Sequence, residues 1–243
     1  AMGPVDPGSG GGGGDNGGAG GGAVWIDATG DVWLYGSIQA NGGRGGTNRG
    51  GGSGGAIRID CRRLFGGATA HLQANGASGN NLGGEGGGGR IAIRYDAGLQ
   101  AQLDHPNPGI KFSIGPGGYG YYKMDRALAG TLYLPDIQTL FLSETLSTQW
   151  NKLRVHLPEW EVWELGSLSV AGKITFPSLR EIRLQGAMSV LNGGELTLVG
   201  GTNALGAPFV CMLLEAGGDI TVAGGGTLML HADPDTGLAP YLE

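Results

Sequence analysis

The sequence Gly54-Gly55-Ala56-Ile57-Arg58-Ile59-Asp60 is a short alternating run that directly follows a glycine tract. The same pattern occurs before it, at residues 21–27, and after it, at residues 88–94. Ile26 and Ile59 occupy the same place in the first two runs. Self-similarity at a fixed period is the signature of a repeat architecture, in which each unit stacks on its neighbours.

The alternation within each run has a period of two, which is typical of short, half-buried β-strands. The repeat continues into the two Gln-Ala-Asn-Gly segments, where Ile38 and Leu72 keep nearly the interval that separates Ile26 from Ile59. One coil of this size buries too little apolar surface to offset its conformational entropy, so the coils are expected to stack.

The glycine tracts shrink farther along the chain, but short alternating runs remain. Leu168 and Met188 are expected to be equivalent positions of neighbouring coils, and Met188 and Ile220 are expected to be equivalent in the same way. The second interval is the longer one because residues 200–210 add an excursion. Both halves of the chain are therefore interpreted as one kind of coil, which a loop sometimes extends.

The expected fold class is all-β, and specifically a right-handed parallel β-helix; a flattened sandwich or prism of the same strands is the alternative. We expect one solenoid domain over residues 1–243, made of a glycine-rich leader (1–21), glycine-tract repeats (22–135) and shorter coils (136–243). Its interior ladders would contain the inward apolar residues Val24, Ile26, Ile57, Ile59, Ile91, Ile93, Leu132 and Leu134.

Glycine makes up 54 of the 243 residues, about three times its usual share of roughly 7%. The glycines are not in a strict every-third register, which argues against a collagen triple helix. We expect the tracts to be ordered excursions that lie side by side as extended, polyproline-II-like (polyglycine-II-like) helices, because only glycine lets backbones approach that closely. Disorder is the alternative for residues 1–21, which have no preceding coil to pack on.

Composition excludes several classes of partner. Charged residues are 15% of the chain and the net charge is −6, whereas nucleic acids and anionic membranes require concentrated positive charge. No apolar run approaches the roughly 20 residues of a membrane span. The ends, Ala1-Met2-Gly3 and Leu242-Glu243, are typical of cloning, so we expect a piece of a longer secreted or cell-surface protein without its export signal.

The two cysteines, Cys61 and Cys211, are far apart in the sequence. Buried free thiols are the first interpretation, and a single long-range disulfide in an oxidising compartment is the second. No cofactor is expected. The sequence Asp233-Pro234-Asp235-Thr236-Gly237 has too few oxygen ligands at the right spacing for a calcium loop, so a structural calcium ion is not indicated.

These repeats, together with Gly-Gly-Arg-Ile-Ala-Ile-Arg-Tyr at residues 88–95 and Ala-Gly-Thr-Leu-Tyr-Leu at residues 129–134, resemble the glycine-rich β-helix repeats of large secreted or surface bacterial proteins. The match covers residues 10–135 well and the rest loosely. It implies export and a solenoid fold, and it identifies no catalytic residue. The architecture is also similar to the β-helical carbohydrate-binding modules attached to plant-polysaccharide-degrading enzymes.

Aromatic side chains at outward strand positions are the first candidates for a site, because exposed flat rings on a rigid face suit stacking against sugars. The other interpretation is that each ring covers a glycine tract or a neighbouring loop. Acidic residues beside the rings could bind sugar hydroxyls. The candidate carbohydrate-binding residues are Trp25, Trp33, Tyr35, Tyr121, Tyr133, Trp160, Trp163, Glu161 and Glu164.

Paired acids are the candidates for chemistry. Asp27 and Asp60 take equivalent outward positions in neighbouring coils, about 4.8 Å apart, and a retaining glycosidase needs carboxyls about 5 Å apart. A ladder of surface charge, with Asp60 paired to Arg58 and Arg94, is the favoured interpretation. We therefore expect no catalytic residue.

The sequence thus predicts a non-catalytic carbohydrate-binding module for a plant cell-wall polysaccharide such as xylan. It would be a monomer linked to catalytic or surface domains of a larger secreted bacterial protein. A structural or adhesive stalk segment is the first alternative, and a β-helix polysaccharide lyase or glycosidase is the second.

Overall fold

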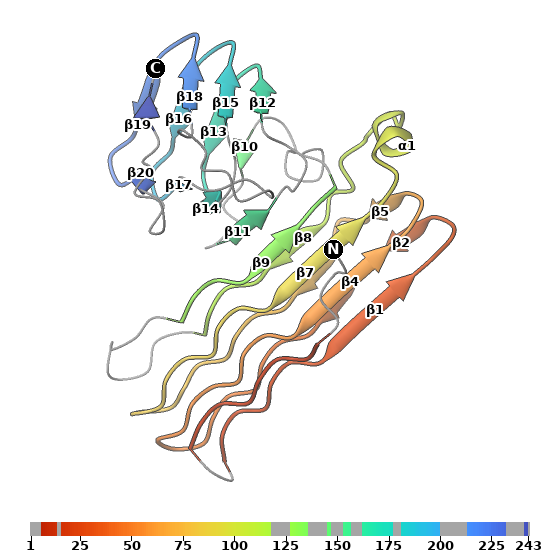
Figure 1. Cartoon of the computed structure of the whole chain (residues 1–243), viewed down its shortest axis with the longest axis vertical. Helices are drawn as coiled ribbons and strands as arrows, with labels where there is room; N and C mark the ends of the chain where they lie inside the picture. The colour runs from red at the N-terminus through yellow and green to blue at the C-terminus, as the bar shows by residue number, and fades with distance from the viewer. Residues whose placement is uncertain are drawn as a thin grey trace, which may run out of the picture. The chain divides into compact units, whose positions relative to one another are not determined.

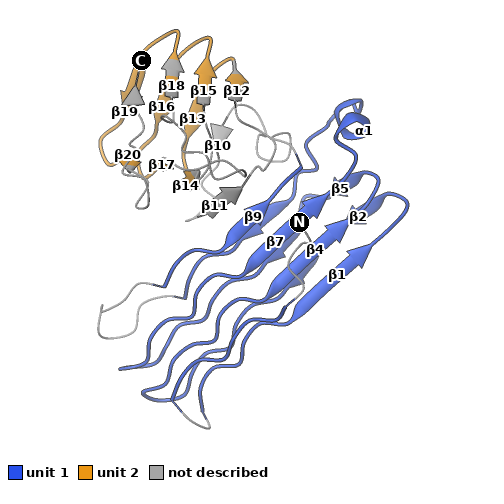
Figure 2. Ribbon diagram, in the orientation of Figure 1, with its two compact units in different colours: residues 1–135 blue, residues 136–243 orange. Residues whose placement is uncertain are grey.

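The computed structural model describes residues 6–13, 16–117, 127–135, 145–146, 153–156, 162–176, 181–199, 213–231 and 241–242. The chain forms two compact units, residues 1–135 (unit 1) and residues 136–243 (unit 2), drawn in Figure 2. Within the described residues the regular structure is β-strand, apart from one short helix, α1 (Ala97–Ala101). The all-β prediction is confirmed.

Unit 1 contains three parallel ladders of short strands (Figure 1). The first ladder joins β1 (Ala23–Asp27), β4 (Ala56–Asp60), β7 (Arg90–Arg94) and β9 (Thr131–Tyr133). The second joins β2 (Val32–Leu34) and β5 (Leu64–Gly66), and the third joins β3 (Ser37–Gln39), β6 (His71–Gln73) and β8 (Lys111–Ser113). Each strand therefore pairs with the equivalent strand of the next repeat.

In the first ladder, residues at equivalent positions of successive repeats are paired. Ile26 pairs with Ile59, and Ile59 pairs with Ile93. Ile59 and Ile93 are completely buried, and burial of such a side chain is worth about 1.5–3 kcal/mol. Ile26 is only half-buried because β1 is the edge strand of its ladder. The apolar residues of successive runs thus form one continuous interior.

Unit 2 repeats the arrangement with shorter connections. Its first ladder joins β10 (Thr145–Leu146), β13 (Leu168–Val170), β16 (Met188–Val190) and β19 (Ile220–Val222). The second joins β11 (Leu153–His156), β14 (Lys173–Phe176), β17 (Glu195–Val199) and β20 (Thr227–His231), and the third joins β12 (Val162–Leu165), β15 (Glu181–Leu184), β18 (Leu213–Ala216) and β21 (Tyr241–Leu242). All the pairs are parallel.

In unit 2, the positions that the sequence predicts to be equivalent are paired in the structure. Leu168 pairs with Met188, and Met188 pairs with Ile220. The shorter interval and the longer one are thus each a single step from one coil to the next. Leu168 and Met188 are completely buried. The predicted equivalence is therefore confirmed for these strands.

The glycine tracts of unit 1 are hydrogen-bonded to one another and leave the ends of the strands as neighbouring extended segments (Figure 1). The amide of Gly18 donates to the carbonyl of Gly50 (2.9 Å), and three residues later Gly21 donates to Ser53 (2.9 Å). A three-residue interval is the repeat of a polyproline-II helix. The tracts thus lie side by side, as expected, and the leader residues 16–21 take part.

Close backbone approach explains the glycine. A Cβ atom added to Gly52 would lie 1.9 Å from the carbonyl oxygen of Ala19, in the neighbouring tract. One added to Gly54 would lie 2.1 Å from the carbonyl oxygen of Ala74. Both contacts are with backbone atoms, which cannot move away by a rotamer change as a side chain could. Larger residues are therefore excluded at these positions.

An asparagine ladder joins the tracts to the third ladder of strands. The Asn41 side-chain oxygen accepts from the backbone amide of Asn75 (2.8 Å). The Asn75 oxygen accepts in turn from the Ser113 hydroxyl (2.7 Å) and from the amide of Gly115 (2.9 Å). The repeated Gln-Ala-Asn-Gly segment therefore has a structural purpose: its asparagine satisfies backbone donors where each strand ends and each tract begins.

Substitution of Gly52 by alanine should destabilise unit 1 by about 2–3 kcal/mol, because the added methyl group meets backbone of the adjacent tract. Gly36→Ala is the matched control, since a Cβ there meets nothing within 4 Å, and it should change stability by no more than about 1 kcal/mol. Denaturant unfolding measures both. Equal stability of the two variants would show that the tracts are not packed as described.

Candidate functional site

A cluster of three aromatic rings lies on the outer side of β2 and β5. Trp33 of β2 is the register partner of Phe65 of β5, and their rings stack with centroids 4.1 Å apart and planes 9° apart. Tyr35, just beyond β2, stacks on Trp33 with centroids 6.3 Å apart and planes 16° apart. Trp33 is 58% exposed and Tyr35 is 67% exposed. Strand alternation turns these rings outward while Val32 and Leu34 face the interior.

An ion pair borders these rings. Arg63 donates from Nε to Oδ1 of Asp31 (3.0 Å) and from Nη2 to Oδ2 (2.5 Å), which is a two-point contact. The Arg63 guanidinium also lies 5.6 Å from the centre of the Phe65 ring. The hydrogen bond from Arg63 lowers the pKa of the Asp31 carboxyl, so it stays ionised. We call Asp31, Trp33, Tyr35, Arg63 and Phe65 the Trp33 cluster.

Trp25 and Tyr133 belong to a different ladder and do not join this cluster. The Arg58 guanidinium lies 4.8 Å from the centre of the Trp25 ring, and that of Arg94 lies 5.6 Å from the centre of the Tyr133 ring. Each ring therefore has a cationic group over one face, which is the usual geometry of a cation–π contact. For these two candidates the structure supports the packing interpretation, although Trp25 is still 58% exposed.

The acidic pair on the same ladder is part of a charge network. Asp27 and Asp60 are register partners, and Arg94 follows in the next coil. Asp60 forms an ion pair with Arg58, and its Oδ1 lies 3.9 Å from Nε of Arg94. Asp60 thus belongs to a ladder of surface charge, as expected.

The remaining candidates lie in less completely described parts of the chain. Glu164 of β12 is exposed, and its Oε1 lies 3.9 Å from Nη1 of Arg183 in β15. Trp163 is also in β12, but its side chain lies outside the described residues. Tyr121, Trp160 and Glu161 lie outside them as well, so the structure does not bring these residues to any site. The same holds for Cys211 and for residues 233–237.

Three members of the Trp33 cluster, Asp31, Arg63 and Phe65, were not among the sequence candidates. The signal was present, because Phe65 follows Trp33 at close to the interval that separates Ile26 from Ile59. Stacking of equivalent positions in neighbouring coils would have placed the two rings together. Repeat spacing is therefore a better guide to this site than exposed aromatic residues taken singly.

Among the described residues, no group of three or more His, Cys, Asp and Glu side chains is arranged to hold a metal ion. No helix in the described part of the chain is long and apolar enough to cross a membrane. Cys61 is a free thiol. Burial, with smaller contributions from Asp31 and Asp60, raises the pKa of this thiol to about 11.

Cys61 should therefore react slowly with iodoacetamide. The rise in pKa from 9.0 to about 11 leaves about 100-fold less thiolate at pH 8, and the thiolate is the nucleophile. In a Cys211→Ser variant, the alkylation rate measured by mass spectrometry should rise with pH up to about 11. The urea-unfolded variant is the control, and a rate that levels off near pH 9 in both states would contradict the burial of the thiol.

No family model, curated protein or solved structure matches this chain. The resemblances to glycine-rich β-helix repeats and to β-helical carbohydrate-binding modules stay predictions from the sequence. The features that bear on function are the geometry of the Trp33 cluster and the packing of the glycine tracts.

Proposed function

We propose that both units are right-handed parallel β-helices and that the glycine tracts of unit 1 are polyglycine-II helices. Support comes from the ladders, in which parallel strands pair with their equivalents in the next repeat. It also comes from the three-residue interval of the tract hydrogen bonds, such as Gly51 to Gly84 (3.0 Å) and Gly54 to Gly87 (2.9 Å). A stack of this kind gives a stiff scaffold on which outward side chains keep fixed positions.

On this scaffold, the function best supported is non-catalytic binding of a plant cell-wall polysaccharide, xylan-like, by a module of a larger secreted bacterial enzyme. The observation that carries the proposal is the Trp33 cluster. Trp33 and Tyr35 expose large ring surfaces at one place, and grouped exposed apolar surface signifies contact with a partner. The stacking holds the rings in place before any ligand binds, which reduces the entropic cost of binding.

The free face of Trp33 is the one turned away from Phe65. Among the described strands β2 pairs only with β5, so that face is directed away from the paired strand. Tyr35 is a weaker platform, since its ring lies against the backbone of Gly67. A pyranose ring could place its apolar C–H face on Trp33 while its hydroxyl groups reach Asp31 and Arg63, which supply acceptors and donors.

Binding is proposed rather than cleavage because Asp60, one of the two carboxylates in register on the first ladder, is held by arginines. The two ion-pair contacts account for the position of the Asp60 carboxylate without a reaction.

A structural or adhesive stalk is the second proposal. The observation in its favour is the extent of the tract packing, since tracts 16–22, 49–55 and 83–89 are joined by repeated hydrogen bonds. Such a bundle would be stiff whether or not a sugar binds. The guanidinium groups over Trp25 and Tyr133 are also consistent with rings that serve packing alone.

Trp33→Ala should weaken retention on xylan in affinity gels by at least about tenfold, because it removes a central aromatic contact. Trp25→Ala is the matched control, equally exposed but outside the cluster, and it should retain binding. A wild-type protein that is retained by no glycan in a panel would favour the stalk. An equal loss of retention in both variants would show that the Trp33 cluster is not the binding site. Release of reducing ends from the polysaccharide would indicate an enzyme.

A further inference from the structure

Tract 49–55 lies at the centre of the glycine-tract bundle. It is hydrogen-bonded to five other tracts of unit 1. The contacts are Ser53 N to Ser9 O (3.0 Å), Gly18 N to Gly50 O (2.9 Å), Gly52 N to Gly43 O (2.9 Å), Ala77 N to Gly52 O (2.9 Å) and Gly51 N to Gly84 O (3.0 Å). A helix with three residues per turn has three N–H groups and three C=O groups per turn, each in its own direction, so such helices can pack with six neighbours. Among the described residues, one neighbour position is therefore open.

Contacts among the five neighbours locate the opening. Tract 8–13 bonds to 16–22, which bonds to 40–46, which bonds to 74–80, which bonds to 83–89, through Gly8 to Gly21, Gly43 to Ala19, Gly42 to Asn75 and Gly86 to Ala77. The ring of neighbours is thus continuous except between its two ends, tract 83–89 and tract 8–13. The sixth position lies between these two tracts and above tract 49–55.

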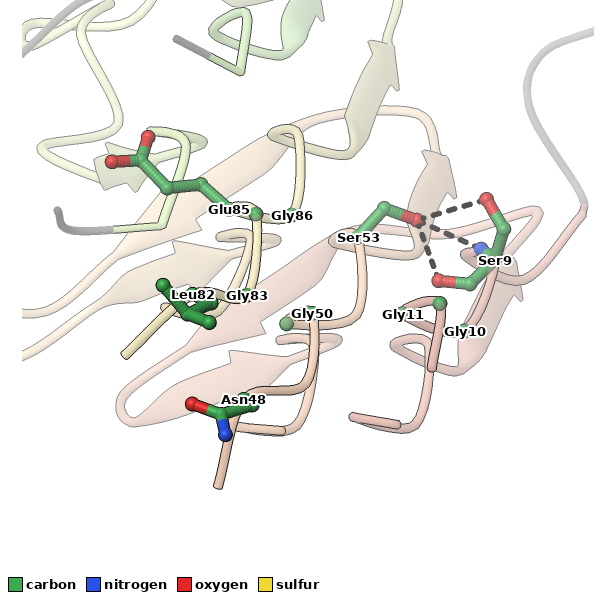
Figure 3. Close-up of a pocket in the computed structure, with 13 residues that line it drawn as sticks. Ser9, Gly10, Gly11, Asn48, Gly50, Ser53, Leu82, Gly83, Glu85 and Gly86 are labelled. Atoms are coloured by element: carbon green, nitrogen blue, oxygen red, sulfur yellow. Dashed lines mark hydrogen bonds between the residues drawn. The ribbon is translucent and has the colours of Figure 1, made fainter. Parts of the chain in front are cut away.

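A groove of about 490 Å³ occupies this position. Its walls come from residues 9–12 and 82–86, and its floor comes from residues 48–53. Figure 3 shows Gly50 and Ser53 in the middle, with Gly10 and Gly11 on one side and Gly83 and Gly86 on the other. Asn48, Leu82 and Glu85 also border it.

The walls of the groove carry glycines that contacts among the described residues do not explain. A Cβ atom added to Gly12 or to Gly84 would meet nothing within 4 Å. A Cβ on Gly50 would lie 3.2 Å from the Gly12 nitrogen and 3.5 Å from the Gly84 oxygen, so Gly50 is directed between the two walls. Small residues are needed here only if another backbone comes close.

Tract 83–89 also has backbone donors that could serve a further tract: one lies in the wall at Gly84, and one lies at Gly87, the residue after the wall. The amides of Gly84 and Gly87 form no hydrogen bond within the described residues. They are three residues apart, the interval at which the paired tracts of this bundle donate to one another. A segment with carbonyl groups at the same interval would satisfy both.

We infer that this groove binds an extended polyproline-II segment of a partner chain that has glycine at every third position. The same packing already occurs five times around tract 49–55, so the sixth position has the shape and the donors for one more tract. The occupant needs glycine where it faces Gly50, just as Gly52 is required opposite Ala19. Its other two residues per turn can be larger, because the groove is open to solvent. The groove shares no residue with the Trp33 cluster, so the two sites can be tested separately.

The probe is a synthetic peptide, acetyl-(Gly-Pro-Asn)₃-amide, in which proline favours the polyproline-II conformation. The matched control peptide has alanine in place of every glycine. In ¹⁵N-labelled protein, the first peptide should shift the amide signals of Gly50, Gly84 and Gly87 saturably at up to about 5 mM, a concentration suited to weak binding. The control peptide should leave them unchanged.

Two variants complete the experiment. Gly84→Val fills the groove and should abolish the shifts, whereas Gly36→Val, at an equally open position outside the groove, should keep them. Gly12→Val serves if Gly84→Val changes the rest of the spectrum. Absence of shifts with the first peptide, or equal shifts with the alanine peptide, would overturn the proposal. Concentration-dependent shifts of the same signals without peptide would show that a second copy fills the groove, and would overturn the partner-chain assignment.

Discussion

Hydrogen bonding between glycine backbones that lie in direct contact is the interaction on which unit 1 depends. The amide of Gly54 reaches the carbonyl of Gly87 in the neighbouring repeat at 2.9 Å, and a Cβ at Gly54 would overlap the carbonyl of Ala74. The glycine tracts of each repeat must therefore run directly against those of the neighbouring repeats. This packing helps to hold the register in which Ile26, Ile59 and Ile93 stack.

The strands and the glycine tracts have different roles in each repeat. The short strands bury apolar side chains and present the alternate residues outward, so equivalent positions of successive coils stack into ladders. Trp33 upon Phe65 and Trp25 beside Arg58 are both products of this stacking, yet they differ in chemistry: the first leaves a grouped ring surface and the second places a cation over a ring. The tracts contribute few side chains, and their surface offers backbone donors and acceptors instead. The two proposed sites thus reflect the two kinds of backbone in the molecule.

Much of the architecture could be predicted from the sequence, because equivalent positions of a repeat identify the residues that pair. The equivalence of Ile26 and Ile59 gives the pairing of β1 with β4 directly, and the alternation gives the inward faces. The site was harder to predict. Exposure of Trp25 and Trp33 was foreseen, but their neighbours decide whether a ring is available, and Phe65 and Arg58 enter only through the stacking of coils. The groove could not have been predicted at all, since it depends on the order of tracts around residues 49–55, which glycine-rich sequence does not encode visibly.

Amide hydrogen exchange of the glycine tracts, followed by NMR, tests the central claim most directly. The paired amides of Gly18, Gly21, Gly51 and Gly54 should exchange many times more slowly than those of Gly12 and Gly84, because they open only when the bundle opens. Along residues 50–55, whose consecutive amides are all paired with other tracts, protection should be continuous. Uniformly fast exchange along the tracts, at the rates of an unfolded chain, would contradict the packed bundle and with it the account of how the repeats are held in register.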